Sequence, residues 1–259
     1  MDEIPTDIWV SNHFLNGRVI ELNKRFQAKN IQNKRFFFGA SVNPNNSKWE
    51  RELDFVLNGT DAVLIKWIPS AQHIQVQKVE HEFYKRLAKK EMPIFSHVGP
   101  EHTFPEGMRQ KKNDHFLHLE IPLNAGVKVV AAHCNTPSIP LLEKNEIEDF
   151  REFMEKENKD EIRLYADTSA LCSITKSHYL PDITKTFNHE WLVHGSDFPI
   201  PITGWVNLPL LRRDITPDEY KEIINCENPF DQDVIIKRAY GMNDSILENV
   251  ENILRMPHA

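Results

Sequence analysis

Residues 127–137 read VKVVAAHCNTP, an apolar run that ends in a histidine and a turn-forming segment. Such a run is typical of a strand that is buried on both faces and followed by a turn. The same order recurs in residues 93–100, PIFSHVGP, and in residues 191–199, WLVHGSDFP. Each of these predicted strands therefore ends in one strongly polar side chain, which is His97, His133 or Asp197.

Further apolar runs predict more strands, and the segments between them have the apolar spacing of helices. The predicted strands are residues 36–42, 62–67, 93–97, 127–133, 164–167 and 191–195. The predicted helices are residues 11–26, 48–57, 75–90 and 143–157, together with much of the chain after Thr216. Strands that are apolar on both faces and alternate with amphipathic helices indicate a parallel sheet covered by helices. Both a barrel and an open sheet fit this pattern.

Several classes of partner are disfavoured by the sequence. Neither GxGxxG nor GxxxxGK[ST] follows a predicted strand, which argues against the common nucleotide-binding open sheets. The net charge is −7, and there is no long basic run that could follow a nucleic acid backbone. The first residues lack the basic and apolar regions of a signal peptide, and no apolar run approaches the length of a bilayer span. We therefore expect neither a nucleic acid nor a membrane as a partner.

Length and cysteine spacing suggest the domain organisation and the compartment. A chain of 259 residues with 40% hydrophobic residues can bury one large core, so we expect a single α/β domain over residues 1–259. The three cysteines, Cys134, Cys172 and Cys226, lie far apart in the sequence and form no CxxC pair. This usage fits a reducing compartment and predicts a cytoplasmic location.

The polar strand ends predict a metal site. In a parallel barrel the C-terminal ends of all strands meet on one face, so His97, His133 and Asp197 are expected to become neighbours there. Two imidazoles and one carboxylate suit a divalent transition metal; we expect zinc, with manganese and iron as alternatives. Such a metal lowers the pKa of a bound water to roughly 7. Asp197 could be a third ligand, or the general base that receives the proton of that water.

Each of these three residues also has an ordinary structural interpretation. A lone histidine at a strand end is more often a hydrogen-bonded structural residue than a ligand, and Asp197 before Phe198 and Pro199 could simply cap a turn. Three such residues, each at the C-terminal end of a strand, favour the metal site, because the coincidence must otherwise occur three times.

Other polar residues near the strand ends are weaker candidates. Lys66, Glu101 and His102 are predicted to contact the substrate, although a lysine at a strand end and loop residues of this kind are as often solvated. Asp167 either lines the mouth or caps the following helix. His194 should point away from Asp197 because side chains alternate along a strand. Cys134 is expected to be a small buried thiol.

Five strings of the sequence together resemble one family. They are LIKWIPSAQ (64–72), HVGPEH (97–102), AAHCNTP (131–137), YADTSAL (165–171) and HGSDFP (194–199). The set resembles the amidohydrolase superfamily, and within it the amidohydrolase-related, metal-dependent hydrolases, a branch that also includes decarboxylases. The resemblance implies a TIM-barrel (β/α)8 fold with a mononuclear or binuclear metal centre.

The resemblance also implies roles for individual residues. His97 would be the ligand on the fifth strand, His133 the ligand on the sixth, and Asp197 the eighth-strand acid that binds or faces the metal and moves the proton. Lys66 falls on the fourth strand, where binuclear members carry a bridging lysine, but we expect a mononuclear centre here.

The chain departs from the family pattern at its N-terminus. The first strand of the family carries a His-x-His pair that supplies two further ligands, and no such pair precedes the first predicted helix. By this count the first two strand positions are missing, so we expect an incomplete barrel with about six strands. Open sheet edges favour aggregation, a rearranged N-terminus, or pairing with another chain, and a homo-oligomer is therefore one expectation.

The leading functional hypothesis is a metal-dependent hydrolase that acts on a small, carboxylated molecule through a metal-activated water. A nonoxidative decarboxylase on the same fold is the alternative. A third hypothesis is a catalytically inactive remnant, since the His-x-His strand is absent.

Overall fold

The computed structural model describes residues 10–29, 36–102, 105, 107, 110–139, 142–200 and 214–256. The chain forms two compact units. The first comprises Met1–His97, Thr103–Val129 and Ile253–Ala259, and the second comprises Val98–His102 and Val130–Asn252. The prediction of a single domain over residues 1–259 stays a prediction. Within the described residues, no helix combines the length and the apolar character that a bilayer span requires.

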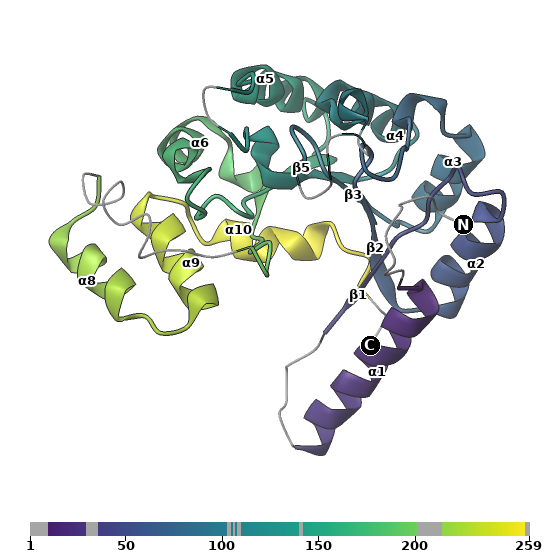
Figure 1. Ribbon diagram of the computed structural model, residues 1–259, viewed down its shortest axis with the longest axis horizontal. Coiled ribbons are helices and arrows are strands. Elements are labelled where there is room, and N and C mark those ends of the chain that lie inside the picture. The colour runs from purple at the N-terminus through teal and green to yellow at the C-terminus, as the bar shows by residue number, and fades with distance from the viewer. Residues whose placement is uncertain are drawn as a thin grey trace. The chain divides into compact units, whose positions relative to one another are not determined.

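In the first unit, helices alternate with short parallel strands (Figure 1). The strands pair in the order β1-β2-β3, with Ala40 opposite Ile65 and Ile65 opposite Ile94. The elements in chain order are α1 (Asn12–Ala28), β1 (Phe38–Ala40), α2 (Trp49–Gly59), β2 (Ala62–Trp67), the 3₁₀ helix η1 (Val76–Lys78), α3 (His81–Lys89), β3 (Ile94–Ser96), η3 (Lys111–Asp114), η4 (Phe116–Leu119) and α4 (Glu120–Asn124).

The core of the first unit is formed by the strands and the apolar faces of α2 and α3. On α2 the buried residues are Trp49, Leu53, Val56 and Leu57, which is the spacing of one helix face. Aromatic rings join the two helices to β2, because the ring of Phe83 lies 5.3 Å from that of Trp49 and 5.5 Å from that of Trp67, centroid to centroid.

The predicted long helix at residues 75–90 is wrong in its first part. Instead, η1 and α3 are separated by extended backbone at Val79 and Glu80. Val76 is buried, and its carbonyl accepts a hydrogen bond of 2.8 Å from the hydroxyl of Tyr84. The hydrogen bond from Tyr84 thus holds a carbonyl near the break in the helix. The apolar spacing of the sequence does not indicate this break.

Apart from Val98–His102, the second unit starts within β4 (Val129–Ala131) and continues the alternation, with the strand order β4-β5-β6. Parallel pairing of β5 and β6 places Ala166 opposite Leu192. The further elements are η5 (Ala132–Asn135), α5 (Ile147–Glu157), β5 (Leu164–Asp167), η6 (Ser177–Tyr179), α6 (Leu180–Thr186), η7 (His189–Trp191), β6 (Leu192–Val193), α8 (Pro217–Asn225), α9 (Pro229–Ala239), α10 (Ser245–Glu248) and η8 (Asn249–Asn252).

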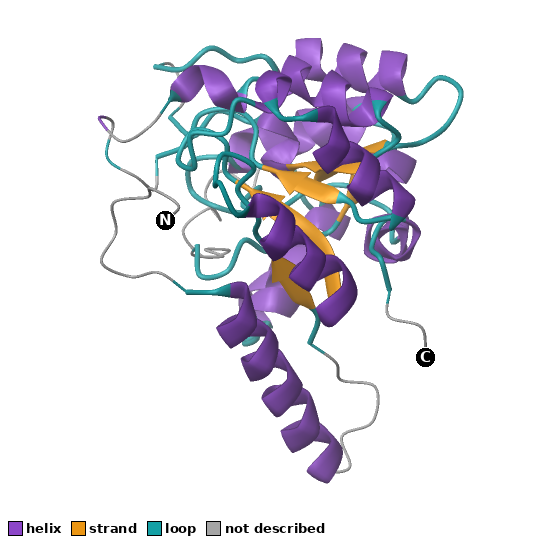
Figure 2. Cartoon of the chain, turned by 90° about the vertical axis from the view of Figure 1, so that its right-hand side faces the viewer, coloured by secondary structure: helices purple, strands orange, loops and turns teal. Residues whose placement is uncertain are grey.

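Helices make up most of the regular structure, and the strands are short (Figure 2). The described residues contain six strands, as the apolar runs predicted, and the predicted strand at 127–133 is shortened to Val129–Ala131. The predicted helix start after Thr216 is confirmed, since Thr216 and Glu219 form a capping box.

Replacement of Tyr84 by Phe should lower the free energy of unfolding by about 1 kcal/mol, because it removes one buried hydrogen bond without opening a cavity. Urea unfolding measures the change. Tyr240→Phe is the matched control, since no hydrogen bond of that hydroxyl is found in the described part of the chain. Equal stabilities of Y84F and the parent protein would contradict the role given to this contact.

Candidate active site

The turn after β4 has an unusual backbone conformation. Three consecutive non-glycine residues, His133, Cys134 and Asn135, have positive φ angles of 56°, 50° and 55°. Left-handed residues other than glycine each cost roughly 1–3 kcal/mol and persist only where the surroundings hold them. Such strain is concentrated at functional sites, so this turn is the first candidate within the second unit.

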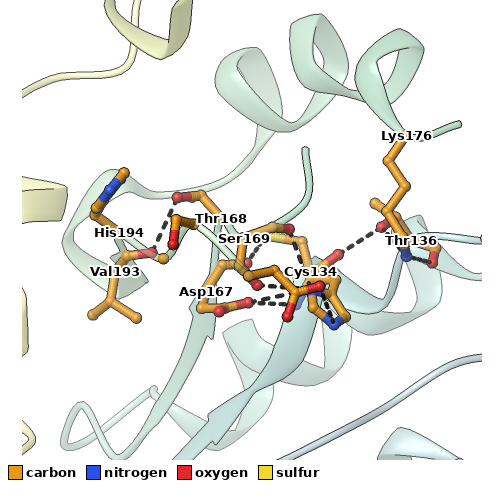
Figure 3. A network of polar contacts seen from close by, with 12 residues as sticks. Cys134, Thr136, Asp167, Thr168, Ser169, Lys176, Val193 and His194 are labelled. Atoms are coloured by element: carbon orange, nitrogen blue, oxygen red, sulfur yellow. Dashed lines mark hydrogen bonds and ion pairs between the residues drawn. The ribbon is translucent and has the colours of Figure 1, made fainter. Parts of the chain in front are cut away.

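Hydrogen bonds from two sides hold this turn in place. The backbone N–H of His133 donates to the carboxylate of Asp167 at the end of β5. Thr136 closes the other side, because its backbone N–H and its hydroxyl donate to the carbonyl of His133 at 3.0 and 2.8 Å. The thiol of Cys134 donates to the backbone carbonyl of Asp167 at 3.2 Å, and burial raises the pKa of that thiol. Figure 3 shows Cys134, Asp167 and Ser169 gathered at this point.

The imidazole of His133 is oriented by Ser169. Its Nδ1 lies 2.7 Å from the hydroxyl oxygen and 3.2 Å from the carbonyl oxygen of Ser169. A carbonyl can only accept, so the tautomer with the proton on Nδ1 satisfies both contacts. The Nε2 atom then presents its lone pair, and it lies 3.9 Å from the Oδ2 atom of Asp197. This is the arrangement common to histidines that ligate metals, where Nδ1–H is held by a backbone carbonyl or a carboxylate.

Asp197 follows β6 and is itself in the left-handed conformation, with φ of 59°. Its side chain is 38% exposed, whereas the side chain of Asp167 is 3% exposed. Gly195, two residues earlier, packs against Asp167: a Cβ atom at Gly195 would lie 2.6 Å from the Oδ2 atom of Asp167. The absence of a side chain at position 195 therefore lets the end of β6 approach the carboxylate that holds the His133 turn.

A buried ion pair on α9 fixes the same end of β6. The ammonium of Lys237 lies 2.5 Å from the Oδ2 atom of Asp233, and both side chains are excluded from solvent. Lys237 also donates to the carbonyl of Gly195 at 3.0 Å. Burial, and then the charge of Lys237, lowers the pKa of His194 to about 4, so this imidazole is neutral at pH 7. The Nδ1 atom of His194 lies 3.4 Å from Nζ of Lys237 and 3.8 Å from the Oδ2 atom of Asp233.

A second buried lysine, Lys176, was not predicted from the sequence. It lies in the segment between β5 and α6, is 6% exposed, and donates from Nζ to the carbonyl and hydroxyl oxygens of Thr136 at 2.8 and 3.1 Å (Figure 3). Burial lowers the pKa of Lys176 to about 8, against the opposing effect of carboxylates led by Glu143 and Asp197. The side chain therefore stays mainly protonated at pH 7.

Glu143 ties two neighbouring loops together. Its Oε1 atom accepts a hydrogen bond from His102, and its Oε2 atom accepts from the backbone N–H groups of Ser138 and Ile139 at 2.7 and 2.9 Å. Burial acts to raise the pKa of Glu143, but these hydrogen bonds outweigh it and lower the pKa. His102, predicted as a substrate contact, thus has a structural partner, and Glu101 beside it is buried.

The structure brings together two of the three predicted ligands, His133 and Asp197. His97 belongs to the first unit, where its backbone N–H donates to the carbonyl of Trp67 at 2.9 Å. Lys66 is also in the first unit, with Nζ 4.2 Å from the centre of the Phe95 ring. The site roles of His97, Lys66, Glu101 and His102 stay predictions.

His133 and Asp197 fit one half of a divalent metal site. Two ligands of a tetrahedral site with bonds near 2.0–2.1 Å lie about 3.4 Å apart, so an adjustment of roughly half an ångström would bring this pair onto one ion. Among the described residues, no group of three or more His, Cys, Asp or Glu side chains is arranged to hold a metal ion. A complete catalytic metal site usually has three protein ligands, so this pair alone would not be sufficient.

Gly195→Ala should displace Asp167 and loosen the His133 turn, because the new methyl group would overlap the carboxylate. We expect a loss of about 1–3 kcal/mol in the free energy of unfolding, measured in urea. Gly17→Ala on α1 is the control, since a Cβ atom there meets nothing within 4 Å and the helix should gain stability. An unchanged stability of G195A would contradict the close approach.

His194→Gln should remove a dependence of stability on acid pH. The pKa of His194 is lower in the folded protein, so its contribution to stability is complete above about pH 6.5 and is lost as the pH falls toward 4. The parent protein should lose up to about 1.4 kcal/mol per pH unit relative to H194Q in this window. Urea unfolding between pH 6.5 and 5 tests this, and parallel profiles of the two proteins would show that His194 is not held neutral.

Comparison with known proteins agrees with the resemblance in the sequence. The family model described as Amidohydrolase matches residues 14–230. No curated protein matches the chain. Among solved structures, an uncharacterized TIM-barrel protein, Bb4693 of Bordetella bronchiseptica, is 16% identical over 88% of this chain and 73% of its own, with a TM-score of 0.53. An amidohydrolase II is 14% identical over 96% and 80%, with a TM-score of 0.45. The 4-oxalomesaconate hydratase of Rhodopseudomonas palustris is 13% identical over 95% and 86%, with a TM-score of 0.44.

The first of these structures confirms the fold class, an α/β fold of the TIM-barrel type. The described residues supply six strands, where a complete barrel of this class has eight. The family match extends over most of the chain, from the first described helix into α9. This chain belongs to the amidohydrolase family.

Proposed function

We propose that the protein is a metal-dependent hydrolase that acts on a small, carboxylated molecule and uses zinc, with manganese or iron as alternatives. The observation that carries the proposal is the orientation of His133, whose Nδ1 is held by Ser169 and whose Nε2 faces the carboxylate of Asp197 at 3.9 Å. Membership of the amidohydrolase family supports a divalent metal at such a pair.

In this proposal His133 and Asp197 hold the ion, with His97 as the third ligand. When bound, a divalent metal supplies Lewis acidity at neutral pH. Asp197 has the exposure that its second task needs: a carboxylate open to solvent can take a proton from the attacking water and return it to the leaving nitrogen or oxygen. Asp167 is buried and already accepts the His133 N–H, so its task is to hold the turn.

A nonoxidative decarboxylase is the second candidate. It would use the same residues, with Asp197 helping to deliver a proton to the carbon that loses carbon dioxide. The partners form part of the proposal as well: a small-molecule substrate, neither nucleic acid nor membrane, and a homo-oligomer formed through open sheet edges in the cytoplasm.

Metal analysis of the purified protein tests the proposal. We expect near-stoichiometric zinc, manganese or iron in the parent protein, and a loss of affinity of more than about 100-fold in His133→Ala, since changes behind a ligand alone cost 10- to 100-fold. His13→Ala is the matched control, because His13 lies on α1 in the first unit. A parent protein that takes up no metal, even when metal is added, would contradict the proposal.

The two reactions are separated by their products. A hydrolase incorporates oxygen from labelled water into its product, whereas a decarboxylase releases carbon dioxide without such incorporation. Asp197→Asn should abolish either activity. Carbon dioxide release from a carboxylated substrate, without labelled oxygen in the product, would replace the first proposal by the second.

A further inference from the structure

The left-handed turn at His133, Cys134 and Asn135 needs a restraint on its C-terminal side. Asp167 holds the first residue of the turn through its N–H. The other end depends on Thr136, whose N–H and hydroxyl both donate to the carbonyl of His133. A rotation of Thr136 away from this position would break both bonds and would release the backbone that directs the imidazole.

Lys176 is placed to prevent that rotation. Its ammonium donates both to the carbonyl and to the hydroxyl oxygen of Thr136, at 2.8 and 3.1 Å, and so fixes the residue at two points. The hydroxyl can accept from Lys176 while it donates to His133, because a threonine oxygen has one proton and two lone pairs. A continuous path of hydrogen bonds therefore runs from Lys176 through Thr136 to the backbone of His133.

Burial of a lysine at position 176 is energetically unfavourable unless its ammonium has a specific role. Burying an ammonium removes its hydration, and a neutral side chain of the same size would fill the space without that cost. Lys176 is nonetheless only 6% exposed, and its ammonium donates two hydrogen bonds to one residue, Thr136. The carboxylates of Glu143, Asp197, Asp167 and Glu101 act on it electrostatically and favour its charged form.

We propose that Lys176 is a positioning residue for His133: by holding Thr136 at two atoms, it keeps the strained turn in place and the Nε2 atom directed toward Asp197. The inference rests on the proposed function, because the benefit of a fixed imidazole is a preformed ligand. Lys176 acts through Thr136 and has no contact with the reacting atoms in this proposal.

The experiment replaces Lys176 by Met, which keeps an unbranched side chain of similar length but removes the donors. Zinc affinity is measured by competition with a chromophoric chelator, and amide hydrogen exchange of residues 131–137 is measured in the metal-free protein. We expect K176M to bind zinc 10- to 100-fold more weakly, as for other residues behind a ligand, and to exchange faster at the Thr136 amide. Lys144→Met is the matched control, because Lys144 is exposed and pairs only at the surface.

Thr136→Val supplies the second variant, and it keeps the test decisive if K176M folds poorly. If Lys176 acts through Thr136, the zinc affinity of the double variant K176M/T136V should be no lower than that of whichever single variant has the lower affinity. Additive losses would overturn the path through Thr136. Parent-like zinc affinity and parent-like exchange in K176M would overturn the proposal as a whole.

Failure of the proposed function gives a different result. A parent protein without zinc affinity contradicts the metal-dependent hydrolase, yet the amide exchange of the metal-free protein still decides whether Lys176 holds the turn. Faster exchange confined to residues 131–137 in K176M supports the positioning role, and exchange equal to that of the parent rejects it.

Discussion

The hydrogen bond from the backbone of His133 to the carboxylate of Asp167 is the contact on which the candidate site depends. It joins the end of β5 to the turn after β4, and it holds the first of three left-handed residues. The same carboxylate leaves room for nothing larger than a hydrogen atom at position 195. One buried acid thus fixes the backbone at His133 and sets the space next to the strand end that leads to Asp197.

Two buried ammonium groups stabilise the segments on either side of this contact. Lys237, on α9, donates to the carbonyl of Gly195, two residues before Asp197. Lys176 donates to Thr136, three residues after His133. In both cases a charged donor is used on a main-chain carbonyl near a strand end, where a weaker neutral donor would hold the chain less firmly. The polar interior of the second unit is therefore organised around the two segments that carry the candidate ligands.

The sequence predicted those parts of the molecule that local pattern determines. Runs such as residues 62–67 and 164–167 gave strands because burial on both faces leaves a continuous apolar string. His133 and Asp197 could be predicted as ligands because they follow such strings directly, and these roles stay predictions. The burial of Lys176 and Lys237 could not be predicted, because no local sequence pattern distinguishes a buried lysine in a loop or helix from an exposed one. The break at Val79 was missed for a similar reason, as Tyr84 holds a nearby carbonyl through a tertiary contact. The left-handed backbone of His133 could not be predicted either, because no local sequence pattern marks a histidine for a positive φ angle.

The burial of Cys134 has a consequence for the chemistry of the turn. A thiol reacts with oxidants, alkylating agents and soft metals chiefly as the thiolate, and burial beside Asp167 disfavours that form. The thiol of Cys134 should therefore not react with such reagents as long as the second unit is folded. Cys172 is protected in the same way, whereas Cys226 is partly exposed after α8. A thiol-directed label would accordingly mark the end of α8 and leave the surroundings of His133 and Asp197 untouched.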